Sequence, residues 1–148
     1  MPTIRIATPE DIPACVTLLG VLFAQEEEFT ADPGLQTRGL EMIIASPAVG
    51  TVFICEHEGA VVGMASLLAT VSTALGGKVA LLEDMVVLPA CRGRGFGTML
   101  VDHACRWARE NGFGRITLLT DGDNEQAHRF YKTLGFVRSG MAAFRKLL

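Results

Sequence analysis

A glycine-rich loop that separates a strand pattern from a helical pattern most constrains what this chain can fold into. The strand pattern covers residues 79–88 and is closed by Pro89, and the loop, residues 92–97, reads Arg-Gly-Arg-Gly-Phe-Gly. Glycines at alternate positions let backbone N–H groups approach an anion, and the dipole of a following helix favours negative charge there. The sequence therefore predicts a strand, a pyrophosphate-binding loop and a helix in that order. Arg92 and Arg94 add positive charge beside the loop.

Other glycine-rich phosphate loops fit this segment less well. A P-loop requires a Gly-Lys-Ser/Thr ending, which is absent, and the dinucleotide fingerprint requires a third glycine at the position that Thr98 occupies. Two alternatives stay open for the loop taken by itself. It is either a tight structural turn or part of a nucleotide-binding α/β domain that would bind adenine nucleotides.

The remaining hydrophobic patterns place strands and helices on both sides of the loop. Thr8-Pro9-Glu10-Asp11 is typical of a helix start, with an N-cap, Pro at the first helical position and acids in the first turn. The predicted strands are residues 4–6, 51–55, 60–71, 79–88 and 116–119, with one or two more in 136–148. The predicted helices are residues 8–23, 35–45, 96–108 and 127–134. This order predicts an α/β (α+β) fold: a single domain, residues 1–148, with helices on the faces of a central mixed sheet.

Composition narrows the class of function. A net charge of −3 and a pI of about 5.6 leave no basic surplus for nucleic-acid binding. The four cysteines are widely spaced and lack a zinc-binding pattern, which predicts reduced thiols, no metal and a cytoplasmic location. Residues 59–77 carry no charge, but their Val-rich start and hydroxyl side chains favour a long buried strand over a membrane span. Charged residues such as Arg5 and Glu10 interrupt any apolar signal region at the N-terminus.

Two motifs in order are similar to the acetyl-CoA signatures of the GNAT superfamily of N-acyltransferases. The first is Arg92-x-x-Gly95-x-Gly97. The second reads Asn124-Glu125-x-Ala127-x-x-Phe130-Tyr131-x-x-x-Gly135-Phe136. The resemblance is strong over residues 80–137 and extends weakly to residues 4–11. Residues 25–49, which commonly shape the acceptor site in this family, match nothing specific.

The resemblance implies a mostly antiparallel sheet, flanked by about four helices, that splays open at a bulge in the strand of Glu83. The pantetheine of acetyl-CoA, the acyl donor, would lie in that cleft. It would bond the backbone of Met85, Val86 and Val87, where one N–H can stabilise the thioester oxyanion. Asn124 is expected to contact the cofactor as well as to cap the last helix. The expected pyrophosphate-binding residues are Arg92, Gly93, Arg94, Gly95, Phe96, Gly97 and Thr98.

An acceptor amine is mostly protonated at neutral pH, so transfer needs a group that takes its proton. Glu83 and Asp84 are adjacent on a strand, so only one of them should face the cleft. The segment around Glu83 resembles that of the polyamine-acetylating branch, which favours Glu83 as the catalytic carboxylate, acting through water. Tyr131 stands at the position that protonates the departing thiolate in many family members. A structural ion pair for the carboxylates and a core position for Tyr131 are the alternatives.

The predicted function is an N-acetyltransferase that moves an acetyl group from acetyl-CoA to a primary amine of a small molecule or peptide, by direct attack in a ternary complex. The alternative is a non-catalytic acyl-CoA sensor or interaction module. The acidic run Glu26-Glu27-Glu28 either is a solvated face or lines the acceptor site and favours a cationic amine. Cys91 has no His or acidic partner nearby for a covalent route. A homodimer through the apolar segment 141–144 is expected by analogy, and neither nucleic acid nor a membrane is expected as a partner.

Overall fold

A five-stranded sheet forms the centre of the protein, which a computed structural model describes over residues 1–26 and 30–148. The strands follow one another across the sheet in chain order: β1 (Thr3–Ile6), β2 (Gly50–His57), β3 (Ala60–Ser72), β4 (Gly77–Val87) and β5 (Ile116–Leu118). The first four strands pair antiparallel, and β5 pairs parallel to β4. The predicted mixed, mostly antiparallel sheet of an α/β fold is therefore confirmed.

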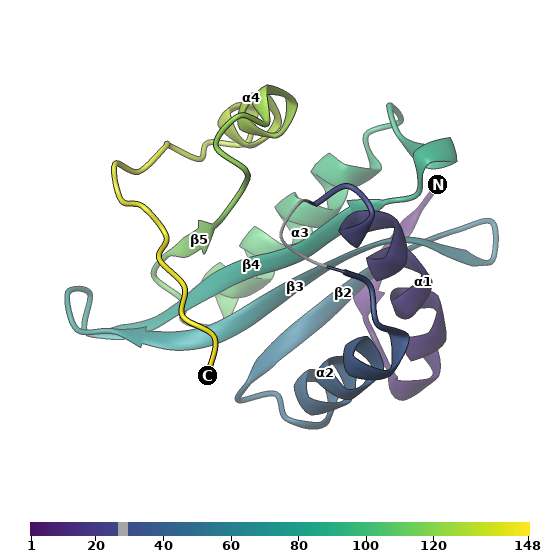
Figure 1. The fold of residues 1–148 in the computed structure, drawn as a ribbon, viewed down its shortest axis with the longest axis horizontal. Helices are drawn as coiled ribbons and strands as arrows, with labels where there is room; N and C mark the ends of the chain where they lie inside the picture. The colour runs from purple at the N-terminus through teal and green to yellow at the C-terminus, as the bar shows by residue number, and fades with distance from the viewer. Residues whose placement is uncertain (27–29) are drawn as a thin grey trace.

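Helices cover both faces of this sheet (Figure 1). The described residues form the α-helices α1 (Ile12–Phe23), α2 (Pro33–Ala45), α3 (Phe96–Glu110) and α4 (Glu125–Thr133). Helices α1 and α2 pack on one face, whereas α3 packs on the opposite face. Among the described residues, no helix is both long and apolar enough to cross a membrane, and the uncharged stretch 59–77 forms β3 with the turn after it.

The apolar run in β2 follows from burial on both faces. Val52 and Ile54 lie in the core beneath α1 and α2, whereas Phe53 and Cys55 lie in the core beneath α3. Successive side chains of a strand point to opposite faces, so a central strand with helices on both sides is apolar at every position. All four side chains are at most 1% exposed.

The predicted helix start at Thr8 is confirmed, and an ion-pair network connects it to the sheet. Pro9–Asp11 form a single 3₁₀ turn before α1, and the Thr8 N–H donates to Asp11 Oδ2 at 2.7 Å. The guanidinium of Arg5 on β1 makes two hydrogen bonds of 2.8 and 2.9 Å to Asp11 and also contacts Glu56 on β2. These hydrogen bonds from Arg5 lower the pKa of Asp11. The contacts hold the start of α1 against β1 and β2.

The second helix begins at Pro33 rather than at the predicted Leu35. Asp32 caps this helix, since its Oδ1 accepts a hydrogen bond from the Leu35 N–H at 3.1 Å. Pro33 then occupies the first helical position, where its missing N–H costs nothing. The capping residue therefore places the helix start at Pro33, ahead of Leu35, the first residue of the apolar helical pattern.

The prediction of one or two strands in residues 136–148 is wrong. This segment follows α4 without regular structure, and its large apolar side chains beyond Phe136 are exposed: Val137, Met141, Phe144, Leu147 and Leu148. A strand forms through ladder bonds to a neighbouring strand rather than through local preference alone. Within the described part of the chain, β5 pairs only with β4, so the segment has no strand partner.

Candidate functional site

A bulge interrupts β4 where the two candidate carboxylates lie. Ser66 of β3 pairs with Glu83, and Met64 pairs with Val86, so the single intervening residue of β3 faces both Asp84 and Met85. Asp84 adopts a φ of 54°, a left-handed conformation that Asp tolerates better than most residues. The bulge that the family resemblance implied is therefore present.

Beside this bulge, β4 and β5 separate. Their ladder covers only three residues of β4, from Ala80 to Leu82. In the described ranges, no strand pairs with the β5-facing edge of residues 83–87, which contain the predicted pantetheine-binding residues Met85, Val86 and Val87. The sheet thus opens at the predicted place, with backbone groups on one edge left without a ladder partner.

The glycine-rich loop enters α3 in a conformation that requires glycine. Gly93 has a φ of 75° and Gly95, the N-cap residue of α3, has a φ of 84°. No side chain of the described residues caps α3, which leaves the first-turn N–H groups, those of Phe96, Gly97 and Thr98, open to an anion.

Two arginines border this loop in different ways. The Arg92 Nε–H donates to the Val87 carbonyl at 2.9 Å, which braces the loop against the end of β4. The guanidinium of Arg94 lies 5.7 Å from the centre of the Phe96 ring, and the Arg94 residue is exposed. Both arginines are exposed, and within the described part of the chain only Arg92 has a hydrogen bond that ties its side chain to β4.

Three distant segments converge at Gly97. A Cβ on this residue would lie 3.0 Å from Met85 Cε of β4 and 3.4 Å from Phe130 Cζ of α4. The loop, the bulged strand and the second motif, which are separate in the sequence, therefore meet at one point. A larger residue at this position would require Met85 to shift by a few tenths of an ångström.

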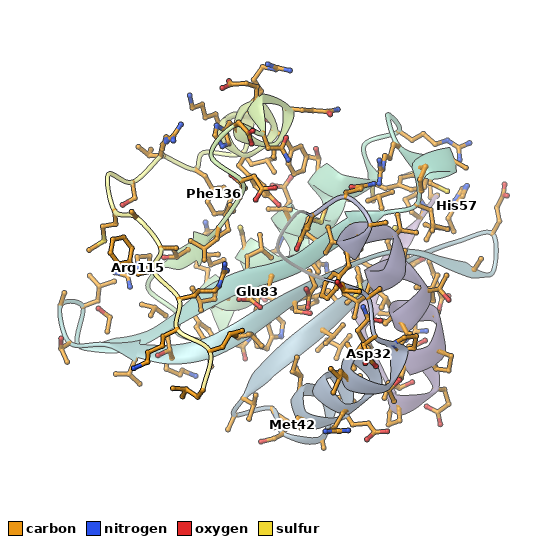
Figure 2. The ribbon with its side chains drawn as sticks, in the orientation of Figure 1. Asp32, Met42, His57, Glu83, Arg115 and Phe136 are labelled. Atoms are coloured by element: carbon orange, nitrogen blue, oxygen red, sulfur yellow. The ribbon has the colours of Figure 1, made fainter. Side chains whose placement is uncertain are left out.

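The second motif places Tyr131 in an aromatic group on α4. Its ring lies 5.0 Å from that of Phe130 and 5.6 Å from that of Phe136, which lies beside α4 (Figure 2). Burial raises the pKa of Tyr131 to about 12, so its hydroxyl is protonated at neutral pH. Asn124 Oδ1 accepts a hydrogen bond from the Ala127 N–H at 3.1 Å, which confirms its predicted capping role.

The two carboxylates differ in surroundings. Glu83, which lies near the middle of β4 in Figure 2, is exposed. Asp84 is half-buried and lines a cavity of about 220 Å³. Burial, with smaller contributions from Glu83 and Glu26, raises the pKa of Asp84 to about 6. Of the two carboxylates, Asp84 is the one that lines this cavity, whereas the sequence favours Glu83 as the residue that faces the cofactor cleft. The catalytic role of Glu83 stays a prediction.

The cavity of Asp84 lies between α1, α2 and the β4 bulge. Its remaining lining residues are Leu19, Phe23, Leu35, Gln36, Gly39, Leu40 and Ile43. Sequence reasoning did not single out Gln36, a buried glutamine on α2. Of the acidic run, Glu26 contributes to the field at Asp84, whereas Glu27 and Glu28 lie outside the described residues.

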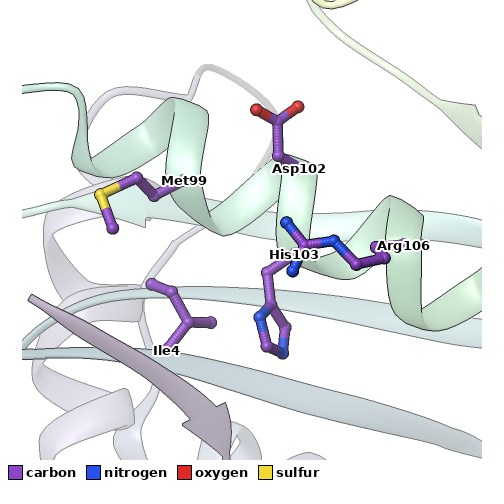
Figure 3. Close-up of a pocket in the computed structure, with 5 residues that line it drawn as sticks. All are labelled: Ile4, Met99, Asp102, His103 and Arg106. Atoms are coloured by element: carbon purple, nitrogen blue, oxygen red, sulfur yellow. The ribbon is translucent and has the colours of Figure 1, made fainter.

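A second cavity, of about 310 Å³, lies between β1 and α3 (Figure 3). Met99, Asp102, His103 and Arg106 of α3 line it together with Ile4 of β1. None of the predicted site residues lines this larger cavity. In the described part of the chain, no group of three or more His, Cys, Asp or Glu side chains could hold a metal ion, and all four cysteines are free.

Comparison with known proteins agrees with this geometry. Residues 20–136 match the model of the acetyltransferase (GNAT) family. A glucosamine 6-phosphate N-acetyltransferase of Trypanosoma brucei brucei is 30% identical over 135 residues, which cover 90% of this chain and 87% of that protein. Two uncharacterised N-acetyltransferases, of Bacillus subtilis and Methanocaldococcus jannaschii, are matched over only 35% and 38% of their own lengths.

Solved structures share the whole fold. An acetyltransferase of Trypanosoma brucei superposes with a TM-score of 0.77 at 28% identity, with complete coverage of both chains. A predicted acetyltransferase of Clostridium acetobutylicum, solved with acetyl-CoA, superposes with a TM-score of 0.81 at 20% identity. That alignment covers 99% of this chain and 96% of the other.

Proposed function

This chain belongs to the acetyltransferase (GNAT) family, and we propose that it moves an acetyl group from acetyl-CoA to a primary amine of a small molecule or peptide. The convergence of the glycine loop, the bulged strand and α4 at Gly97 is the observation that carries the proposal. It brings together the first turn of α3, the part of β4 that has no ladder partner on its β5-facing edge among the described residues, and Phe130, the sequence neighbour of Tyr131. We take residues 1–148 as one catalytic domain.

The residues around this point fit acetyl-CoA. The uncapped first turn of α3, with Arg94 beside it, would hold the pyrophosphate, and Arg92 keeps the loop in place through its bond to Val87. The backbone of residues 85–87 would bond the pantetheine amides, and Asn124 would contact the cofactor from the start of α4. Bound there, acetyl-CoA supplies an acetyl thioester that an amine can attack directly.

Two carboxylates can take the proton that the attacking amine must lose. Glu83 would act through water, because it is exposed. The observation that favours Asp84 instead is its pKa of about 6, close to the operating pH, where a general base is most effective. The pH dependence of kcat/KM in the single variants Glu83→Gln and Asp84→Asn separates the two. In the wild type, kcat/KM should fall at low pH as the base becomes protonated. The variant in which this fall is absent identifies the base.

Tyr131 would donate a proton to the departing sulfur. Its pKa of about 12 keeps the hydroxyl protonated, whereas a thiol has a pKa near 8.5 and its thiolate takes up a proton readily. In direct attack, the new C–N bond forms as the C–S bond breaks. One proton leaves the amine for a carboxylate and another reaches the sulfur, so no covalent acyl-enzyme is needed.

Two further features belong to the proposal. We propose a cytoplasmic location, which the free cysteines support, and a homodimer. The exposed apolar side chains of Met141 and Phe144, 90% and 96% exposed, support an association of two copies.

A double variant, Glu83→Gln with Tyr131→Phe, tests whether the site is catalytic. We expect calorimetry to show acetyl-CoA binding close to that of the wild type, while acetylation of the best amine falls by at least a hundredfold. Saturable acetyl-CoA binding by a wild type that acetylates no amine would instead support the non-catalytic sensor. Absence of binding would contradict the assignment of the cofactor residues.

A further inference from the structure

The cavity beside the β4 bulge contains a buried amide that bonds to nothing in the described part of the protein. Gln36 on α2 lines this cavity, and the residue is 9% exposed. Neither Nε2 nor Oε1 has a hydrogen-bond partner among the described residues. Buried polar side chains nearly always have such partners, so this amide is suited to a ligand.

The rest of the cavity restricts what that ligand can be. Apart from Gly39, Gln36 and Asp84, the described residues that line it are apolar, and Asp84 alone is charged. A carboxylate attracts the cationic form of an amine and disfavours an anionic group in the same small space. At about 220 Å³ the cavity is smaller than a typical drug-sized site, which suits a compact molecule.

The chemistry of glutamine selects the group at the other end of the ligand. Its amide offers N–H donors and a carbonyl acceptor in one plane. A second amide satisfies the donor and the acceptor at once through two parallel hydrogen bonds. An alkyl chain satisfies neither of them. An ammonium group can only donate, and a carboxylate can only accept. An uncharged carboxamide is therefore the best complement to Gln36.

We propose that Gln36 determines acceptor specificity and selects a primary amine with a short apolar body that ends in a carboxamide. The amine end lies toward Asp84, and the apolar body contacts Leu19, Leu40 and Ile43. The inference deepens the proposed acetyl transfer and rests on it. It also distinguishes this chain from the relative that is named for glucosamine 6-phosphate, because no lysine or arginine among the described lining residues would receive a phosphate.

Four amines of similar length test this selection. The probes are 4-aminobutanamide, pentylamine, 4-aminobutanoate and 1,5-diaminopentane, each titrated by NMR into protein saturated with coenzyme A. We expect the wild type to bind 4-aminobutanamide about tenfold more tightly than pentylamine, the value of one or two net hydrogen bonds. The other two probes should bind more weakly than 4-aminobutanamide.

A substitution of similar volume removes the amide without emptying the cavity. In Gln36→Met the preference for 4-aminobutanamide over pentylamine should fall to about one. The matched control is Gln126→Met, the same change at an exposed residue of α4, which should keep the tenfold preference. The ratio of two ligands, rather than affinity alone, is the readout, because a purely structural role of Gln36 would weaken both probes equally.

The outcomes separate this inference from the proposed function. An unchanged ratio in Gln36→Met, or tighter wild-type binding of any of the other three probes, overturns the inference even if amines are acetylated. Mass spectrometry of the same samples with acetyl-CoA in place of coenzyme A then tests transfer. Selective binding of 4-aminobutanamide without an acetylated product would support the ligand class and contradict the transferase.

Discussion

Replacement of Asp84 by asparagine should stabilise the protein at neutral pH. Burial raises the pKa of Asp84 from its usual 3.8 to about 6, so the folded state disfavours the charged form. A difference of about two pH units corresponds to roughly 3 kcal/mol, since each unit is worth about 1.4 kcal/mol. Because Asp84 is only half-buried, we expect Asp84→Asn to increase the free energy of unfolding by about 1 to 3 kcal/mol at pH 7.

The pH dependence of this gain identifies its cause. Below pH 4 the carboxyl is protonated in both the folded and the unfolded state, so wild type and variant should be about equally stable. The gain should develop between pH 4 and 6 and stay constant above pH 7. Asparagine also tolerates the left-handed conformation of residue 84, so backbone strain changes little.

Urea unfolding at several pH values, from 4 to 8, measures this difference. Glu83→Gln is the matched control, because it removes the same charge from the exposed neighbour and should change stability by less than about 0.5 kcal/mol. A variant Asp84→Asn that is no more stable than the wild type at pH 7, or whose gain is equally large at pH 4, would refute the reasoning.

Three further changes test the loop and the C-terminal segment. Gly95→Ala should destabilise the protein by about 1 kcal/mol in urea unfolding, because an L-residue is strained at a φ of 84°. Nothing lies within 4 Å of the new Cβ, so a clash would not explain the loss, and unchanged stability would contradict the left-handed cap. Arg94→Ala should weaken coenzyme A binding about tenfold in calorimetry at low salt and less at high salt, and an effect independent of salt would exclude a phosphate contact. Phe144→Asp should convert a dimer into a monomer in light scattering, and a wild type that is already monomeric would contradict the proposed dimer.

Much of the fold could be predicted because its signals are local. The cap at Thr8, the glycines that border α3 and the helical spacing after Phe96 each act within a few residues, and the structure confirms the elements that they predict. The prediction of strands in residues 136–148 is wrong for the opposite reason. Its apolar residues resemble strands, but a strand depends on a partner strand that is distant in the sequence.

The candidate site could be predicted only in part. The loop and the second motif were recognised from their residues, yet their convergence at Gly97 depends on the folded chain. Alternation along β4 indicates that Glu83 and Asp84 differ in orientation, but the bulge beside them changes the local geometry, so alternation cannot assign the faces. The sequence alone predicts an exposed Gln36, because glutamine is usually exposed. Only the packing of α2 shows that this residue is buried.

Detection of the product tests the central claim most directly. The protein would be incubated with acetyl-CoA and a pooled panel of small amines and peptides, and the mixture analysed by mass spectrometry, which avoids the background of four free thiols in a thiol-release assay. We expect at least one amine to gain an acetyl group, and the product to disappear in the variant Glu83→Gln with Tyr131→Phe. Saturable acetyl-CoA binding with no acetylated amine anywhere in the panel would contradict the account.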